Sequence, residues 1–325
     1  MRPLLLPPNQ FHRFYRGGAR IDALRGAPAG EDGRPEDWVG STATSWGSDD
    51  EGLSRLEDGS VLRDAIQADP EAFLGAEHVA RWDADPALLV KLLDAGERLP
   101  VHYHPGRAFA REHLGLRYGK TESWLILEAE PDAAVHVGLR EPVEPETVRG
   151  WVETQDAEEM LAALHRVPVA AGDAILVPAG TLHAIGGGIL LLELQEPTDL
   201  SVLVEWERFG VDDGPEHLGL GWDTALRSLD REPIDPAALS APGDGLLPRE
   251  ADPYFRAERV RGGDVLAPSF AILLVTEGEG MLDELPLSRG TTVVIPHAAG
   301  ATTLTGDVEA IRCLPPSPTA GEGNW

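Results

Sequence analysis

The stretch that decides the fold runs from Leu88 to Trp124 and reads LLVKLLDAGERLPVHYHPGRAFAREHLGLRYGKTESW. At its centre, His102 and His104 are separated by one residue. Side chains at positions i and i+2 of a β-strand point to the same face, so both imidazoles can converge on one small object. The spacing therefore predicts half of a metal site.

Two further ligand candidates follow in the chain. Glu122 stands in GKTESW, at the head of an apolar run, and His183 stands in GDAILVPAGTLHAIG. In the second motif Gly172 begins a turn into a buried strand, Pro178 and Gly180 shape the next turn, and His183 emerges on the strand after it. Three imidazoles and one carboxylate suit Zn, Fe(II), Mn, Co or Ni.

Bulk composition narrows the class of protein. The chain has 325 residues and a formal charge of −28, which argues against nucleic acid or an anionic membrane as a partner. One cysteine, Cys313, excludes an intrachain disulfide and fits a reducing compartment. The first residues, MRPLLLPPNQ, do not form a signal peptide, and no apolar run reaches the length of a membrane span. We expect a cytoplasmic protein.

The order of elements predicts a mainly β fold. Short strand-like runs such as WLILEAE, AVHVGL and GGILLLELQEP are separated by Gly and Pro at roughly ten-residue spacing, which is typical of a β-barrel or sandwich. Helices are expected over Ser60–Gln67 and Glu71–Arg81. A helical segment near 146–165, with Asp156 as a helix N-cap, interrupts the strands. This order argues against a doubly wound parallel sheet.

A weak internal repeat divides the chain. The runs AILLVTEGEG and GTTVVIP echo the earlier WLILEAE and GDAILVPAG, which predicts two related β-barrels in tandem. We expect an N-terminal region and metal-binding barrel over 1–209, a connector over 210–252 and a second barrel over 253–325. The second copy lacks the HxH pair and has only His297 near the matching turn. It is predicted to be a structural copy without a metal.

Most other histidines are expected to be structural, because a lone histidine is more often a hydrogen-bonded residue than a ligand. These residues are His12, His78, His113, His136, His165, His217 and His297. Glu122 could also be a solvated strand residue, and only its KTE context favours a ligand.

At this point the chain resembles the type I mannose-6-phosphate isomerases, zinc-dependent enzymes of the cupin superfamily. The matching stretches are KLLDAGERLPVHYHP, GKTESWLIL, VPVAAGDAILVPAGTLHAIGGGILLLELQEPTDLSV and, more weakly, PLLLPPNQ, GGARIDAL, EDWVGST and the C-terminal GTTVVIPHAAG. The resemblance implies tandem cupin (bicupin) β-barrels with an inserted helical segment. It implies a metal at His104, Glu122 and His183, with the remaining ligand at the position of His102. It also implies interconversion of an aldose and a ketose phosphate.

Two positions depart from the family pattern. The family has QxH at the first ligand pair, where this chain has His102 and His104, so an imidazole nitrogen replaces an amide oxygen and lowers the Lewis acidity of the ion somewhat. The family also places an Asp and, four residues later, an Arg after the second motif. Here Asp199 is present, but the arginine position is Leu203 and the nearest cation is Arg208.

Isomerisation through an enediol requires proton transfer between C1 and C2, together with a Lewis acid. The candidates for proton transfer are Lys120 and Asp199. A neighbouring metal ion would lower the pKa of Lys120, although Lys120 could instead be a surface lysine at a strand entry. Arg107 and Arg111 could clamp a phosphate, although such arginines are commonly solvated or salt-bridged.

Taken together, the sequence predicts a metal-dependent aldose–ketose isomerase that interconverts mannose 6-phosphate and fructose 6-phosphate or a related sugar. Its partner is a small-molecule sugar or sugar phosphate, and Zn is the expected metal, with Fe, Mn, Co or Ni as alternatives. Trp38, Trp46 and Trp124 could stack on the sugar or be buried. Two other functions stay open: an Fe(II) cupin oxygenase, and a non-catalytic sugar-binding or regulatory cupin.

Overall fold

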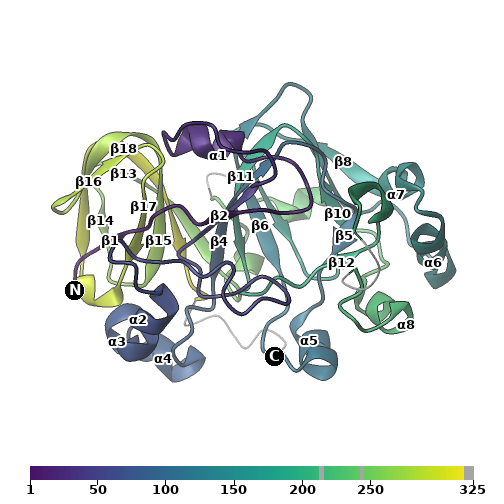
Figure 1. The fold of residues 1–325 in the computed structure, drawn as a ribbon, viewed down its shortest axis with the longest axis horizontal. Helices are drawn as coiled ribbons and strands as arrows, with labels where there is room; N and C mark the ends of the chain where they lie inside the picture. Colours follow the sequence, from purple (N-terminus) through teal and green to yellow (C-terminus); the bar gives the residue numbers. More distant parts are fainter. Residues whose placement is uncertain (212–215, 242–244, 318–325) are drawn as a thin grey trace.

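The chain folds into three β-sheets with helices at their margins (Figure 1). The structure is a computed structural model that describes residues 1–211, 216–241 and 245–317. The fold is mainly β, as predicted from the strand spacing. Within these three ranges, no helix has the length and apolar character that crossing a bilayer requires. The element order argued against a doubly wound parallel sheet, and the strands of the described residues indeed pair antiparallel within their sheets.

The central sheet has six strands in the order β2-β3-β4-β11-β6-β9. Their bounds are β2 Gln10–Phe11, β3 Glu36–Val39, β4 Leu89–Ala95, β11 Ile189–Gln195, β6 Glu122–Ala129 and β9 Ala174–Val177. The apolar runs LLVKLLDA and ILLLELQ form the two middle strands, and every residue of β4 and β11 is buried.

A five-stranded sheet packs against one face of the central sheet, in the order β12-β5-β10-β7-β8. Its strands are β12 Val202–Leu203, β5 His102–Tyr103, β10 His183–Ile185, β7 Ala134–Leu139 and β8 Leu164–Pro168. The two sheets share an apolar core that joins Leu93 and Trp124 of the central sheet to Val135, Val137 and Ile185 of the second. His102 and His183 lie in strands of this second sheet and His104 directly follows β5, so its position sets the position of the site.

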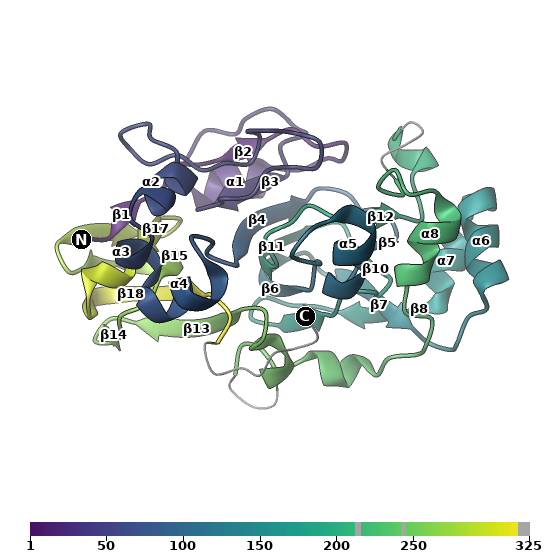
Figure 2. The ribbon, with the colours of Figure 1, turned by 90° about the horizontal axis from the view of Figure 1, so that it is seen from below.

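The C-terminal residues build a seven-stranded sheet against the other face of the central sheet (Figures 1 and 2). Its strands are β1 Leu4–Leu5, β13 Arg256–Arg261, β14 Val265–Leu266, β15 Ala271–Leu282, β16 Leu285–Ser288, β17 Thr292–Ile295 and β18 Thr302–Leu314. Val90 and Leu192 of the central sheet meet Ile272 and Val294 of this one. The strand β1 comes from the N-terminus and pairs with β17.

Alternation along β4 explains why the central sheet can be buried on both faces. Val90 and Leu92 point toward the C-terminal sheet, whereas Lys91 and Leu93 point toward the five-stranded sheet. Burying each apolar side chain contributes about 1.5–3 kcal/mol to stability. Lys91 is the charged residue on the face toward the five-stranded sheet, and it lies where the apolar core ends and the candidate site begins.

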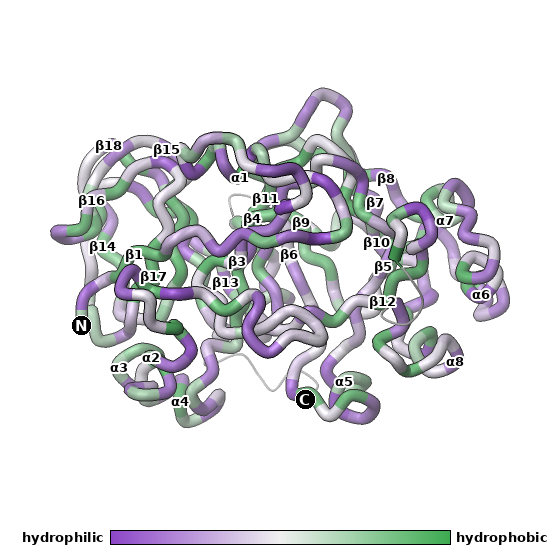
Figure 3. Tube along the Cα trace, in the orientation of Figure 1, coloured by the Kyte–Doolittle hydropathy of each residue, from purple (hydrophilic) through white to green (hydrophobic). Residues whose placement is uncertain are grey.

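Helices flank the sheets. Those beside the C-terminal sheet are α2 Leu62–Ala68, α3 Pro70–Leu74 and α4 Ala76–Trp82; those beside the five-stranded sheet are α6 Pro145–Thr154, α7 Ala157–Ala163 and α8 Trp222–Ala225; the remaining two are α1 Ala19–Leu24 and α5 Arg107–Leu114 (Figure 2). In Figure 3 hydrophobic segments follow the strands, and hydrophilic ones gather in loops and on the outer helices.

The predicted helices differ in detail from the observed ones. The single helix expected over Glu71–Arg81 is divided into α3 and α4 at Gly75, whose φ of 85° ends the first helix. The segment near 146–165 forms α6 and α7, and the Asp156 side chain accepts a hydrogen bond from the Glu159 N–H at 3.0 Å. The predicted N-cap is therefore confirmed.

Candidate metal centre

Strand pairing brings the three predicted histidines together. In the β5–β10 ladder His102 lies directly opposite His183, and side chains of directly opposed residues share a face. The ring centroids of these two residues are 4.1 Å apart, and the His104 ring is 4.9 Å from that of His183. All three side chains are buried, and their possible ligand atoms lie within 4.8 Å of one another.

Backbone carbonyls fix which nitrogen of each ring is available. The Nδ1 atoms of His102, His104 and His183 lie 2.9, 2.6 and 2.8 Å from the carbonyl oxygens of Pro100, Leu200 and Thr181. A carbonyl oxygen only accepts, so each Nδ1 donates and each Nε2 keeps its lone pair. The Nε2 atom of His183 is buried and has no hydrogen-bond partner among the described residues.

Two of the imidazoles, those of His102 and His104, are held in the neutral form. Burial, with the neighbouring His183, holds the pKa of His102 well below its usual value. Burial, with the ammonium group of Lys120, lowers the pKa of His104 to about 3. Neutral rings with outward lone pairs are what a metal ion requires of imidazole ligands.

Glu122, the first residue of β6, adds a carboxylate to this group. Its Oε2 lies 3.0 Å from His104 Nε2 and its Oε1 lies 3.3 Å from His183 Nε2. Since these nitrogens carry lone pairs, they cannot donate to the carboxylate, and a cation between the atoms would satisfy both sides. The indole N–H of Trp124 also donates to Oε1, at 3.0 Å, which orients the carboxylate. The donor set and its geometry fit a divalent metal ion.

Lys120 lies inside this cluster. Its Nζ is 2.8 Å from Glu122 Oε2, 3.0 Å from His104 Nε2 and 3.7 Å from Glu193 Oε1, and the residue is 5% exposed. The reading of Lys120 as a surface lysine is therefore wrong. Burial opposes the charged ammonium, but the carboxylates of Glu122 and Glu193 raise its pKa, whereas the sequence prediction was a pKa lowered by a metal.

Asp199 belongs to a second set of buried charges that the sequence did not reveal. Both oxygens of Asp199 accept hydrogen bonds from Arg13 Nη2, at 2.9 and 3.0 Å, and the backbone N–H of Trp46 donates to Oδ2 at 3.1 Å. Arg13 Nε also donates to Glu36 Oε1 at 2.9 Å. Arg13 therefore joins the N-terminal segment to the loop that carries Asp199.

Lys91 and Glu193 enter the site from the middle strands of the central sheet. The register aligns Trp38, Lys91, Glu193 and Trp124 in one row across β3, β4, β11 and β6. Lys91 Nζ lies 3.6 Å from Glu36 Oε2 and 4.6 Å from the Trp38 ring centroid. These residues could have been predicted from the sequence, because each is a charged residue within an otherwise apolar stretch of a strand, LLVKLL or ILLLEL.

The carboxylates of this region have divergent acidities. Burial would raise the pKa of Glu36, but Arg13 and Lys91 hold it well below its usual value, and the Tyr15 O–H and Trp38 N–H also donate to it. Burial and the negative charge of Glu122 raise the pKa of Glu193 to about 8. Such divergence is typical of functional sites.

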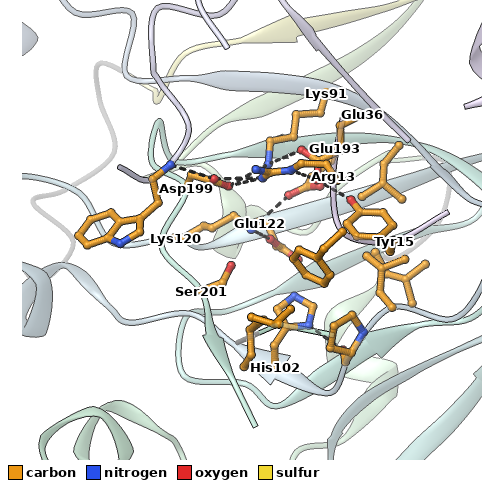
Figure 4. A pocket seen from close by; sticks show the side chains of 18 of the residues that line it. Arg13, Tyr15, Glu36, Lys91, His102, Lys120, Glu122, Glu193, Asp199 and Ser201 are labelled. Carbon is orange, nitrogen blue, oxygen red and sulfur yellow. Dashed lines mark hydrogen bonds and ion pairs between the residues drawn. The ribbon is translucent and has the colours of Figure 1, made fainter. Parts of the chain in front are cut away.

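These residues line a cavity of about 220 Å³ between the central and five-stranded sheets (Figure 4). Its charged lining residues are Arg13, Glu36, Lys91, Lys120, Glu122, Glu193 and Asp199, with His102 at one wall. Its apolar lining residues include Phe14, Trp46, Leu99, Leu203, Val211 and Leu218. Of the residues predicted from the sequence, the cavity thus brings together His102, Glu122, Lys120 and Asp199.

The three arginines considered for substrate binding, Arg107, Arg111 and Arg208, do not line this cavity. Arg107 is buried, donates from Nε to Glu196 Oε1 and lies with its guanidinium 4.6 Å from the Tyr254 ring centroid. Arg111 is exposed on α5, and Arg208 is exposed with its guanidinium 5.7 Å from the Phe209 ring centroid. Their role in substrate binding stays a prediction that the geometry does not support. Trp38 and Trp124 are fully buried, whereas Trp46 is exposed at the cavity.

Fold and site together define a mainly β protein whose buried histidine cluster could hold a metal ion, and comparison with known proteins gives its family. The mannose-6-phosphate isomerase of Streptococcus mutans is 29% identical over 324 residues, 95% of this chain and 97% of the relative. The isomerase ManA of Bacillus subtilis is 30% identical over 235 residues, covering 69% and 73%. No protein-family model matches the chain.

Solved structures agree. The mannose 6-phosphate isomerase of Bacillus subtilis superposes with a TM-score of 0.77 at 25% identity, over 96% of this chain and 99% of that one. A mannose 6-phosphate isomerase solved with zinc and yttrium has the same fold, with a TM-score of 0.73 at 17% identity, over 98% of this chain and all of that one. The chain belongs to the type I mannose-6-phosphate isomerase family.

Proposed function

We propose that this protein is a metal-dependent aldose–ketose isomerase of the mannose-6-phosphate isomerase kind, acting through an enediol. The observation that carries the proposal is the convergence of three imidazoles and the Glu122 carboxylate beside Lys120, at one wall of the cavity. Family membership supports the reaction class. It does not favour the oxygenase or the non-catalytic alternative.

The metal ligands we propose are His102, His104, Glu122 and His183. Zinc is the first choice, because three imidazoles and a carboxylate suit it, and Fe, Mn, Co or Ni have compatible donor preferences. A bound divalent ion supplies Lewis acidity that stabilises the developing enediolate oxygens. The family has an amide at position 102, and the imidazole of His102 is a stronger donor to such a metal ion than an amide oxygen.

Proton transfer is proposed for Lys120, with Asp199 as the second candidate. Isomerisation removes a proton from C2 of the aldose and returns one to C1, while a hydroxyl proton moves from O2 to O1, so no external oxidant or reductant is needed. Lys120 Nζ lies beside the metal position and lines the cavity, within reach of a sugar held there. Asp199 is anchored on both oxygens by Arg13, which suits it better to orienting a hydroxyl.

The domain arrangement we propose is a bicupin. A metal-binding cupin with a helical insertion near 146–165 occupies 1–209, a connector occupies 210–252, and a degenerate cupin occupies 253–325. Support comes from the separate apolar core of the C-terminal sheet, which is built from residues between Val260 and Leu314. The β1 strand from the N-terminus completes that sheet.

The test is isotope exchange by metal-replete protein in deuterated water. Mannose 6-phosphate, fructose 6-phosphate and the free sugars are each incubated with the protein, and products and deuterium at C1 and C2 are measured by NMR. Interconversion with deuterium incorporation is expected for at least one aldose–ketose pair. Protein that carries its metal yet neither interconverts nor exchanges any of them would contradict the isomerase assignment. Oxygen consumption with bound iron would contradict it too.

A further inference from the structure

We propose that a second cavity, at one end of the C-terminal sheet, binds the carboxylate or phosphate group of a small organic anion between Arg256 and Arg312. The cavity has a volume of about 280 Å³ and lies between helices α3 and α4 and strands β13 and β18 (Figure 2). Among the described residues, it shares no lining residue with the cavity of the candidate metal centre. The proposal therefore goes beyond the isomerase function, and either can fail without the other.

The strand register puts the two arginines on one face of the sheet. Arg312 of β18 lies directly opposite Glu258 of β13, two residues along from Arg256. Arg256 in turn lies opposite Leu314. Directly opposed residues and residues two apart on a strand share a face, and here that face also carries Val260 and Leu314 of the apolar core. The two guanidinium groups therefore lie where that core ends.

Arg312 is the buried member of the pair, at 3% exposed, and its donors are only partly used. Its Nη1 donates to Glu258 Oε2 at 3.2 Å, and its Nη2 donates to the Ala267 carbonyl oxygen at 2.6 Å. The Nε–H group is buried and has no acceptor among the described residues. A buried donor without an acceptor indicates that a ligand or water occupies the adjoining space.

Arg256, which is half-buried, adds a second positive charge without a carboxylate of its own. Its Nε donates to the Pro315 carbonyl oxygen at 3.1 Å, and it forms no ion pair with a carboxylate of the described residues. Burial lowers the pKa of Arg256, and the charge of Arg312 lowers it further, although neighbouring carboxylates oppose this. Water can accept from a free N–H, but an anion also balances the charge, so the pair favours an anion over water.

The lining also indicates the class of anion. Guanidinium groups only donate, and their N–H geometry matches the paired oxygens of a carboxylate or phosphate. The apolar part of the lining includes Leu74, Pro268 and Leu314, which suit a short carbon chain. An engineered cavity of about 150 Å³ already holds benzene, so this cavity has room for an organic anion of a few carbon atoms.

The carboxylates of the lining, Glu77 and Glu258, are both exposed. Salt screens the repulsion between such exposed charges and an anion, whereas the buried Arg312 acts at contact distance. The chain as a whole carries −28, so no long-range field draws an anion toward the cavity. We therefore expect a modest affinity that depends on direct contacts, with a Kd of about 1 mM.

The first experiment follows the arginine Nε–H signals of ¹⁵N-labelled, metal-replete protein by NMR, with Arg312→Lys to assign the Arg312 signal. Glycerol 3-phosphate, succinate and the neutral control glycerol are titrated separately. We expect at least one anion, but not glycerol, to shift the Arg312 signal saturably while the exposed Arg259 signal stays in place. The tighter anion shows whether the site prefers phosphate or carboxylate. An Arg312 signal that neither anion shifts at about twenty times the expected Kd, or that glycerol shifts equally, would overturn the proposal.

The second experiment measures binding of the tighter anion by calorimetry in Arg312→Gln, Arg256→Gln and the matched control Arg259→Gln. Arg259 lies on the opposite face of β13, outside the cavity. Each of the first two changes is expected to weaken binding about tenfold or more, the scale of a lost charge-assisted hydrogen bond, whereas the control binds like the wild type.

Arg256 is half-buried, so Arg256→Gln keeps the test decisive if Arg312→Gln does not fold. Thermal melting shows which variants are folded. Binding that folded arginine variants retain in full belongs to another site, such as the metal centre, and would overturn the proposal. Neither experiment measures turnover, so a failed isomerase assay leaves this result unaffected.

Discussion

The metal-site region and the C-terminal sheet share a local pattern, a strand followed by a proline and a turn, but the pattern serves different purposes in the two regions. In the first, β9 runs into Pro178 and a turn, and β10 then begins at His183. In the C-terminal sheet, β17 runs into Pro296 and a short 3-10 helix, and β18 begins at Thr302. Both first residues are fully buried, but one is a metal ligand candidate and the other a threonine.

The difference shows which region loses stability in order to hold functional groups. The core of the C-terminal sheet is built from residues such as Leu273, Val293 and Leu304, and among the described residues its strands bury a single charged side chain, Arg312. The face of the central sheet toward the site instead buries Lys91, Glu122 and Glu193. Taking charges out of water is unfavourable unless each is compensated. A similar strand pattern therefore stabilises one region and carries chemistry in the other.

The largest predicted effect of a substitution is at the first residues of β10 and β18, His183 and Thr302, which occupy matching places in the two regions. His183→Ala is expected to lose the bound metal and all measurable turnover, because the remaining ligands no longer enclose the ion. Thr302→Val, the matched change in the C-terminal sheet, is expected to keep both. Metal content by mass spectrometry and isomerase assays give the readout. A His183→Ala protein that retains a full equivalent of metal would refute the proposed ligand set.

A second prediction separates metal binding from proton transfer. Lys120→Ala is expected to keep its metal but to lose turnover by about 10²–10⁴-fold, the usual contribution of a positioned acid or base. Lys120→Met, which keeps much of the side-chain volume, is expected to behave alike. Retained turnover in either variant, with metal bound, would remove Lys120 as the proton carrier.

A third prediction compares buried and exposed ion pairs. Arg13→Leu leaves Glu36 and Asp199 with the more distant Lys91, at 3.6 and 3.9 Å, as their shared cation, so we expect a loss of about 3–5 kcal/mol in the free energy of unfolding. Arg259→Ala breaks an exposed pair with Glu309 in the C-terminal sheet and is expected to cost less than about 1 kcal/mol. Urea denaturation measures both. Equal effects would show that the site charges are no more strongly coupled than surface ones.

The smallest expected effect concerns pH. His102 and His104 have pKa values below that of a free histidine, so below about pH 6.5 the unfolded chain takes up protons that the folded protein does not. Stability is therefore complete above this pH and falls as pH decreases, by about 1.4 kcal/mol per pH unit for each such histidine. Metal-free protein melted at pH 7.5 and 5.5 gives the slope. The His102→Gln/His104→Gln variant should show a shallower slope, and an identical one would contradict the prediction.

Much of the metal centre was readable from the sequence. An HxH pair on a strand, a Glu at a strand start and a PxGxxH turn each have a local pattern, and β5, β6 and β10 bring them to one place. The helical segment near 146–165 was readable for the same reason, since helical periodicity and the Asp156 cap are local signals.

The rest depends on contacts that no local pattern encodes. Arg13 reaches Asp199 across 186 residues, and nothing around HRFYRGG marks it as a site residue. Of the two arginines considered for a phosphate clamp, Arg107 contacts Glu196 and Tyr254 instead, because α5 directs it there, and Arg111 is exposed. Lys91 and Glu193 could have been found, since a charge within a buried strand needs a partner.

The N-terminal segment has a consequence for the order in which the protein is made. Leu4 and Leu5 pair with Val294 and Val293 of β17, whereas β2, a few residues later, pairs within the central sheet. During synthesis the first strand must wait until almost the whole chain has left the ribosome before its partner exists. Arg13 follows β2 in the chain, and its partners Glu36 and Asp199 are made before β17, so the charge network can form before the C-terminal sheet closes. A nascent chain stalled before β17 would contain all the proposed metal ligands, but its β1 strand would have no partner.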